Sequence, residues 1–494
     1  MRRWALATSL FLVCVGLIAP RALATLAVGP AAQLPRSAAP SFTPKVRLYL
    51  PLILKGSAPA MTPTPTTMPT PTATPGARCP SPEPPFITDL QVRPIPSLAE
   101  PAPRTYFRDP TFGRCLVRVT DRAHDLDPDD PSAGLVNEYS RVQSFNADES
   151  RILVRGIQAT WYLYDAATLR PLRRLPEVEI DPRWDATNPE LLYYSAGTSL
   201  MAYDVRLGQA TLVHDFAADF PGQNLAAVWT RWEGSPSLDG RTWGLMAQDE
   251  DWNVVAFLIY DLQADRVIAQ RALPDRPSID SVTISPLGNY FLAYYDDYCQ
   301  PGHLGDDAHP CGLMVYDRNL ANGRSLLRIV GHSDTALDAQ GREALVYQDI
   351  DTDHISMLDL ATGTVTALWP IDFSHSAIGL HFSGRAFRRP GWALVSTYNG
   401  ARPTSATWMD DQVFAVELRA GGHVVRLAHT RSVYDENIEQ DYWAEPHASV
   451  NRDFTRVLFT TNWGRSGTEE TEMFLIERPP DWPTRLQGAG ESAH

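Results

Sequence analysis

One turn pattern recurs seven times along the chain, and each copy leads into an apolar strand. After a further strand, every turn is followed by an apolar residue and then an acid, as in Tyr164-Asp165 and Tyr260-Asp261. Repeats of about 40–60 residues built from short strands are typical of propeller blades. The seven copies are NADESRILV from Asn146, DATNPELLYY from Asp185, SLDGRTWGLM from Ser237, SPLGNYFLAYY from Ser285, DAQGREALVY from Asp338, RRPGWALVS from Arg388 and NRDFTRVLF from Asn451.

Each repeat is predicted to fold as four short strands. In the first repeat these are SRVQSF, RILVRG, TWYLYD and PLRRL, whereas the last repeat offers only three. An open ring would expose a long sheet edge, which favours aggregation, and the segment RCLVRVTD from Arg114 can supply the missing strand. The sequence therefore predicts an all-β, seven-bladed β-propeller over residues 86–480, closed by an N-terminal strand and followed by a disordered tail at 481–494.

The N-terminal region has the pattern of an exported protein. An apolar run from Trp4 to Ile18 precedes Ala22-Leu23-Ala24, which predicts a signal peptide over residues 1–24. Residues 25–85 contain MTPTPTTMPTPTATP and predict a disordered, Thr/Pro-rich linker. We expect a secreted or cell-surface protein that is not an integral membrane protein after cleavage. Whether the apolar box at 45–56 anchors the protein stays open.

The net charge of −15 narrows the choice of partners. Nucleic acids and anionic membranes are disfavoured, because both are themselves negatively charged. A glycan, a peptide or a protein is compatible with this charge, and we expect the chain to be a monomer.

Four cysteines remain after the predicted signal peptide, in a compartment where disulfides persist. Cys299 and Cys311 bracket the polar loop QPGHLGDDAHP and are predicted to form a local bridge. Cys79 and Cys115 either pair with each other, which ties the linker to the domain, or remain as thiols.

Candidate functional residues come from aligning the repeats on their turns. At the start of the innermost strand, three adjacent repeats place imidazoles and carboxylates at the same two levels. Such donors suit Mn²⁺, Zn²⁺ or Ca²⁺; the alternative is that they satisfy backbone groups and bound water in a wet channel. The candidate metal ligands are His332, His381, Glu445 and His447, and the candidate ligand-binding residues at the channel mouth are Asp181, Arg183, Arg231, Asp334 and Ser383.

The turns SLDG at Ser237 and SPLG at Ser285, together with the Tyr-Asp pairs, resemble those of TolB-like and WD40-like propellers of secreted bacterial proteins. The stretches RDPTFGRCLVRVTD and HASVNRDFTRVLFTTNWG are similar to an uncharacterised group of exported propellers. A more distant resemblance is to oligogalacturonate lyases. It implies a divalent metal held by His332, His381 and His447, with Glu445 near the place of a glutamine, and proton abstraction next to a uronate carboxylate.

Two functions follow from these observations. The first is an exported binding module that presents its channel mouth to an extracellular glycan, peptide or protein. The second is a metal-dependent polysaccharide lyase, similar to oligogalacturonate lyase, or another polysaccharide-active enzyme. A third reading is a scaffold of the cell envelope. The sequence contains no complete G-x-S-x-G, H-E-x-x-H or P-loop motif, so no catalytic residue is assigned and enzymatic activity is left undecided.

Overall fold

The computed structural model describes residues 78–490 apart from positions 81, 377, 400–406 and 436. Within these residues, 29 strands form seven sheets. The signal peptide predicted at 1–24 and the linker as far as residue 77 lie outside the described residues. Among the described helices, none has both the length and the apolar character that crossing a membrane requires.

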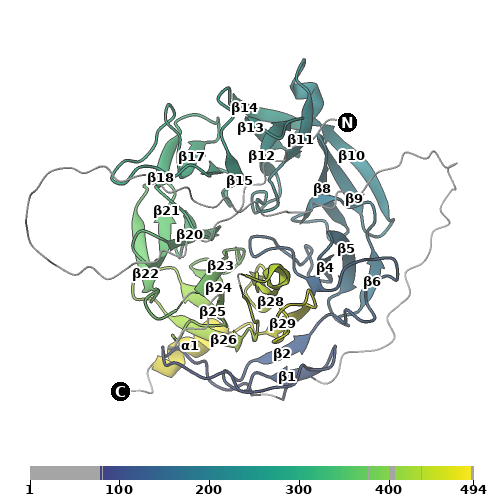
Figure 1. Ribbon diagram of the computed structural model, residues 1–494, viewed down its shortest axis with the longest axis vertical. Coiled ribbons are helices and arrows are strands. Elements are labelled where there is room, and N and C mark those ends of the chain that lie inside the picture. The colour runs from purple at the N-terminus through teal and green to yellow at the C-terminus, as the bar shows by residue number, and fades with distance from the viewer. Residues whose placement is uncertain (1–77, 81, 377, 400–406, 436, 491–494) are drawn as a thin grey trace, which may run out of the picture. The chain divides into compact units, whose positions relative to one another are not determined.

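Each sheet is one blade, and the blades stand radially around a common centre (Figure 1). Six blades have four antiparallel strands, which follow the chain from the centre outward. Blade one is β3 (Leu135–Val136), β4 (Arg151–Gly156), β5 (Thr160–Asp165) and β6 (Pro171–Arg174); blade two is β7 (Ile180–Trp184), β8 (Leu191–Ala196), β9 (Ser199–Asp204) and β10 (Gln209–Asp215); blade three is β11 (Leu225–Trp229), β12 (Thr242–Asp249), β13 (Val254–Asp261) and β14 (Arg266–Ala272). Blade four is β15 (Ile279–Ile284), β16 (Tyr290–Tyr295), β17 (Leu313–Asp317) and β18 (Arg324–Leu327); blade five is β19 (Ser333–Leu337), β20 (Glu343–Asp349), β21 (His354–Asp359) and β22 (Val365–Pro370); blade six is β23 (Ile378–Ser383), β24 (Trp392–Asn399), β25 (Gln412–Glu417) and β26 (Val424–His429).

The seventh blade joins the two ends of the domain. It contains β27 (Ser449–Val450), β28 (Arg456–Thr461) and β29 (Glu472–Glu477), followed by β2 (Cys115–Arg118) and β1 (Tyr106–Arg108) from the other end of the chain. β2 pairs with β29 in antiparallel register from Cys115↔Glu477 to Arg118↔Phe474. The predicted seven-bladed propeller and its closure by an N-terminal strand are confirmed; β1 is an additional outer strand.

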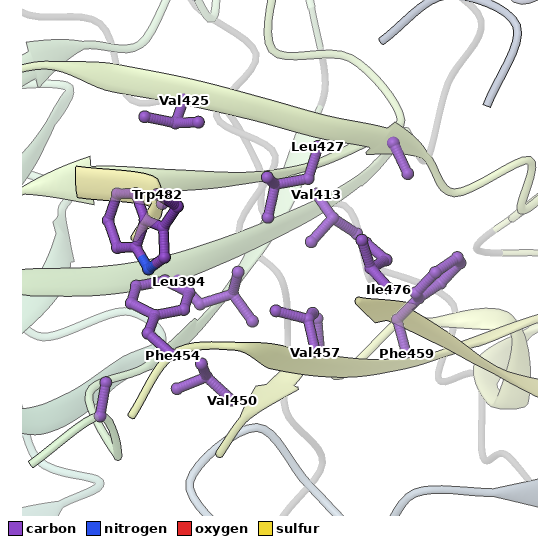
Figure 2. Close-up of a cluster of buried hydrophobic side chains, with 14 of the residues drawn as sticks. Leu394, Val413, Val425, Leu427, Val450, Phe454, Val457, Phe459, Ile476 and Trp482 are labelled. Carbon is purple, nitrogen blue, oxygen red and sulfur yellow. The ribbon is translucent and has the colours of Figure 1, made fainter. Parts of the chain in front are cut away.

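Neighbouring residues of the middle strands serve two different cores. On β20, the adjacent Leu345 and Val346 are both fully buried, but they belong to different apolar clusters on the two faces of blade five. This follows from the alternation of side chains along a strand when both faces of a sheet are covered. Figure 2 shows one such core, with Leu394 and Val413 of blade six facing Val457 of blade seven.

The first repeat departs from its predicted strand pattern. SRVQSF, at residues 140–145, was expected to be its innermost strand, but that strand is β3, and residues 137–144 leave the sheet. The chain returns at Phe145, which forms an isolated bridge with Ile152. The excursion is held by side chains of other blades: Arg141 forms an ion pair with Glu233 at 2.8 Å.

The segment after residue 480 also differs from the predicted disordered tail. Trp482–Gly490 form helix α1, and the Trp482 side chain is fully buried. Its ring centroid lies 4.8 Å from that of Trp392 and 5.5 Å from that of Phe454, and the Arg478 guanidinium lies 3.5 Å from it. Burial of this aromatic ring holds the segment on the ring of blades (Figure 2).

Residues at the end of the predicted linker are also attached to the propeller. Cys79 forms a disulfide with Cys115 on β2, and Cys299 forms the predicted bridge with Cys311. Glu83 forms an ion pair with the fully buried Arg114 at 3.0 Å. The domain therefore includes residues before 86, because covalent and ionic contacts attach them to blade seven.

A buried histidine on β26 lies beneath this N-terminal segment. The Phe112 ring packs between His429, with ring centroids 4.8 Å apart, and the Arg426 guanidinium, also 4.8 Å away. Within the described part of the chain, neither ring nitrogen of His429 has a hydrogen-bond partner. Burial, and then the charges of Arg431 and Arg426, lower the pKa of His429 from 6.5 to about 4.

This histidine predicts a loss of stability on acidification. In the unfolded chain the imidazole of His429 takes up a proton near pH 6.5, whereas in the folded chain it does so only near pH 4. The neutral, buried His429 therefore contributes fully to the free energy of unfolding above about pH 6.5, and this contribution is lost as the pH falls toward 4. Between pH 7 and 5, we expect His429 to account for roughly 1–2 kcal/mol of the fall in the free energy of unfolding. Urea denaturation at both pH values should show a smaller fall for His429→Gln than for the unchanged protein. His309→Gln, which alters an exposed histidine, is the control; an equal fall in all three proteins contradicts the assignment.

Candidate metal centre in the propeller channel

Two inner-strand regions bring three ionisable side chains together. His381 lies within β23, the innermost strand of blade six, opposite Ser396. Glu445 directly follows the short helix η2 (Glu439–Ala444), and His447 lies just before β27. His447 has a left-handed backbone with φ of 43°. Such a conformation in a non-glycine residue costs about 1–3 kcal/mol and persists only where the surroundings fix it.

The three side chains have the geometry of metal ligands. The Nε2 atoms of His381 and His447 each lie 3.4 Å from Oε2 of Glu445, and one ligand atom from each residue lies within 4.8 Å of the others. Donors on adjacent corners of a tetrahedron with bonds of about 2.0–2.1 Å are about 3.3–3.4 Å apart. The histidine–carboxylate distances therefore match a shared ion.

The imidazole of His381 is buried and lacks hydrogen bonds within the described part of the chain. Its side chain is only 1% exposed, and neither ring nitrogen forms a hydrogen bond with the described residues. An unsatisfied buried polar group costs about 1–3 kcal/mol. Burial first, and then the nearby His447 and His332, lower the pKa of His381 well below 6.5. The imidazole is therefore neutral at physiological pH, which is the form that binds a metal.

Aromatic side chains enclose the centre. The Tyr398 ring stacks on His381, with centroids 5.4 Å apart. Burial, and then the charge of Glu445, raise the pKa of Tyr398 well above 10, so its side chain is a neutral phenol. Tyr139, from the excursion of blade one, lies 4.9 Å from His447 between ring centroids.

The fourth predicted metal ligand, His332, stands beside this group. Its ring packs edge-on against His381, with centroids 4.4 Å apart. It is not among the three residues whose ligand atoms lie within 4.8 Å of one another. Burial lowers the pKa of His332 to about 4, with Glu445 opposing and Arg141 adding to the effect. His332 is therefore a neutral base next to the three ligands.

Of the five predicted ligand-binding residues, Asp181 and Arg183 hold neighbouring blades together. Asp181 Oδ2 accepts hydrogen bonds from the backbone and hydroxyl of Thr230, at 3.0 and 2.6 Å. Arg183 forms an ion pair with Glu138 at 2.9 Å and donates to the Gly234 carbonyl at 2.8 Å. Both are buried.

The other three predicted residues also contact neighbouring blades. Arg231 donates to the Ile279 carbonyl. Asp334 pairs with Arg385, and Ser383 Oγ accepts from the Val450 amide at 3.3 Å. The structure therefore brings three of the four predicted metal ligands together and places the five ligand-binding candidates in contacts between blades.

A second feature of this mouth was not found from the sequence. The Arg155 guanidinium at the end of β4 lies 5.3 Å from the Trp232 ring and 5.5 Å from the Trp443 ring. Its Nε is buried and has no hydrogen-bond partner among the described residues. Tyr442, beside Trp443, is 52% exposed. We call Arg155, Trp232, Tyr442 and Trp443 the aromatic rim.

Two nitrogen donors and one oxygen donor suit particular ions. Imidazole and carboxylate together bind Mn²⁺ or Zn²⁺, whereas Ca²⁺ prefers sites made only of oxygen. Three protein ligands also leave coordination positions for water or a bound ligand, the pattern of catalytic rather than structural sites. The structure thus contains a His/Glu site that fits a divalent transition metal.

Solved structures share the fold of this chain. An oligogalacturonate lyase in complex with manganese matches 76% of this chain and 96% of its own, with 15% sequence identity and a TM-score of 0.53. An oligogalacturonate lyase from Vibrio parahaemolyticus matches 76% and 97%, with 12% identity and a TM-score of 0.52. TolB from Acinetobacter baumannii matches 59% and 63%, with 17% identity and a TM-score of 0.31.

No protein-family model matches this sequence, and no curated protein matches it. At identities of 12 and 15% the structural likeness to the oligogalacturonate lyases concerns the fold. The resemblance to propellers of this kind, predicted from the sequence, is confirmed at that level.

Proposed function

We propose that this protein is an exported binding protein that holds one Mn²⁺ or Zn²⁺ ion at His381, Glu445 and His447 and binds an acidic glycan at the same mouth. The observation that carries the proposal is the buried imidazole of His381, which has no hydrogen-bond partner among the described residues and lies close to a carboxylate that a second imidazole shares. When bound, the metal supplies a positive charge that attracts a carboxylate of the ligand.

The residues around the centre support this role. The rings of Tyr398 and Tyr139 pack against His381 and His447 and restrict the orientation of both imidazoles, as neighbours of metal ligands commonly do. The aromatic rim offers ring faces for stacking on a sugar, and Arg155 offers a guanidinium for a second carboxylate. The fold likeness to an oligogalacturonate lyase in complex with manganese agrees with both parts of the proposal.

The first test is metal content. The purified protein, loaded with Mn²⁺ or Zn²⁺ and desalted, should hold one ion per chain by elemental analysis, and titration calorimetry should give the same stoichiometry. His381→Ala and Glu445→Gln each remove one of three ligands and should weaken binding at least tenfold. His429→Ala is the matched control, because it removes another buried histidine without touching the centre. Equal metal binding by His381→Ala and His429→Ala contradicts the proposed ligands.

The second test is ligand binding by the metal-loaded protein. An oligogalacturonate should bind with a measurable Kd, and a neutral galactose oligosaccharide of the same length should bind much more weakly. Loss of the charge-assisted contact in Arg155→Gln should raise the Kd about tenfold. Arg151→Gln changes the other end of the same strand and should have no effect. Equal affinity for the charged and the neutral sugar contradicts the proposed ligand.

A second candidate function is lyase chemistry at this site. It is favoured by His332, a neutral imidazole whose ring centroid lies 4.4 Å from that of the metal ligand His381. In this reaction His332 takes the proton next to a uronate carboxylate, the electron pair forms a C=C bond, and the glycosidic C–O bond breaks; the leaving oxygen takes a proton from water and departs as the alcohol.

Turnover is measured as ultraviolet absorbance of the unsaturated product. His332→Gln should abolish it while metal content and sugar binding stay unchanged. Binding of the acidic glycan without any unsaturated product leaves the binding function and excludes the lyase. Turnover that survives in His332→Gln contradicts its role as the base.

A further inference from the structure

A pocket lies at the opposite end of the channel from the metal centre. Glu445 and His447 precede the innermost strand of blade seven, whereas Arg452 of the pocket follows it. Trp184 and Arg385 likewise stand at or after the ends of β7 and β23. The pocket has a volume of about 50 Å³ and is lined by residues of blades one, two, three, six and seven.

Three arginines contribute to this pocket. Two of them, Arg183 and Arg385, are held in place by ion pairs with carboxylates. Arg183 is anchored by Glu138. Arg385 is anchored by Asp334, to which it donates through Nε and Nη2, so that Nη1 stands outside this ion pair. Both guanidiniums are almost fully buried and therefore rigid, which suits recognition of a planar or tetrahedral oxyanion.

Arg452 gives the pocket its uncompensated charge. Its Nη1 donates to the carbonyls of Phe145 and Asn146, at 3.3 and 2.8 Å, and within the described residues it forms no ion pair. Burial, opposed by the more distant charge of Glu149, lowers the pKa of Arg452. Removing a guanidinium from water without a counter-ion is costly, so an anion in the pocket would be stabilised by it.

The walls of the pocket are apolar or neutral. Besides the arginines, the lining includes Trp184, Leu238 and Phe387, and none of the lining residues is an aspartate or a glutamate. The whole chain carries a net charge of −15. The pocket is lined by three arginines and no carboxylate. Its charge is therefore positive, opposite to the net charge of the protein.

We infer that this pocket binds a single oxyanion group, a carboxylate, sulfate or phosphate, carried by a ligand distinct from the one at the metal centre. Arg452 supplies the net charge, Arg385 supplies the positioned N–H donors of its Nη1, and the apolar walls contact the body of the ligand; the N–H groups of Arg183 are mostly engaged by Glu138 and by backbone carbonyls. A volume of about 50 Å³ admits such a group rather than a whole sugar ring. This site does not depend on the proposed metal.

In the experiment, the full chain is titrated with sulfate, phosphate and acetate at constant ionic strength. Binding is measured by calorimetry and by the shift in melting temperature. At least one anion should bind saturably at one site per chain, and the preferred anion distinguishes a tetrahedral group from a carboxylate. Arg452→Gln should weaken binding at least tenfold, because it removes a charge-assisted contact. The absence of saturable binding of all three anions would overturn the inference.

Two matched pairs of variants separate the pocket from general effects of charge and folding. Leu238→Glu places a carboxylate on the pocket wall and should also weaken binding at least tenfold; Leu287→Glu makes the same change in the corresponding turn of the next blade, outside the pocket. Arg388→Gln removes the charge of an exposed arginine. Arg388 follows the same inner strand as Arg385 but does not line the pocket. Equal weakening by Leu238→Glu and Leu287→Glu would overturn the site. Metal content should be the same in all variants.

Discussion

The pairing of β2 with β29 is the contact on which the rest of the structure depends. Because these strands come from opposite ends of the domain, their ladder turns a row of seven blades into a ring and covers the outer edge of β29 in blade seven. Blades six and seven follow each other in the chain, and their innermost strands β23 and β27 are in contact. This packing brings His381 next to Glu445 and His447, and the closed ring surrounds the three residues with the other blades.

Much of the fold could be predicted from the sequence, because turns and strand alternation are local signals. Seven turns, each followed by a pair of an apolar residue and an acid, predicted the blade number, and the unpaired RCLVRVTD segment predicted the closure. The path of residues 137–144 could not be predicted in this way. It is set by partners distant in sequence, such as Glu233 for Arg141, and the period of a strand carries no information about them. Helix α1 was missed for a similar reason: one tryptophan, buried by residues far along the chain, orders a short polar segment.

The candidate site was predictable to the extent that it follows the repeat. Alignment on the turns placed His381, Glu445 and His447 at shared levels, and the fold makes those levels neighbours. His332 aligns at the same position of its repeat but lies beside the group of three. An aligned position determines how far along the channel axis a residue lies, and it does not determine the direction of its side chain. Tyr139 was missed because the alignment assumed an unbroken strand in blade one, and Arg155 because its setting consists of side chains from three different blades.

The excursion at residues 137–144 explains how one channel can carry two sites of opposite character. Its side chains contact five other blades: Glu138 reaches Arg183 in blade two, Arg141 reaches Glu233 and Ser333 in blades three and five, and Tyr139 packs on the histidines of blades six and seven. A segment with such contacts must lie near the axis. It contacts residues of both sites: Tyr139 packs on His381 and His447, and Glu138 pairs with Arg183. Buried ion pairs like these contribute little net stability, but they fix the position of the segment between the blades.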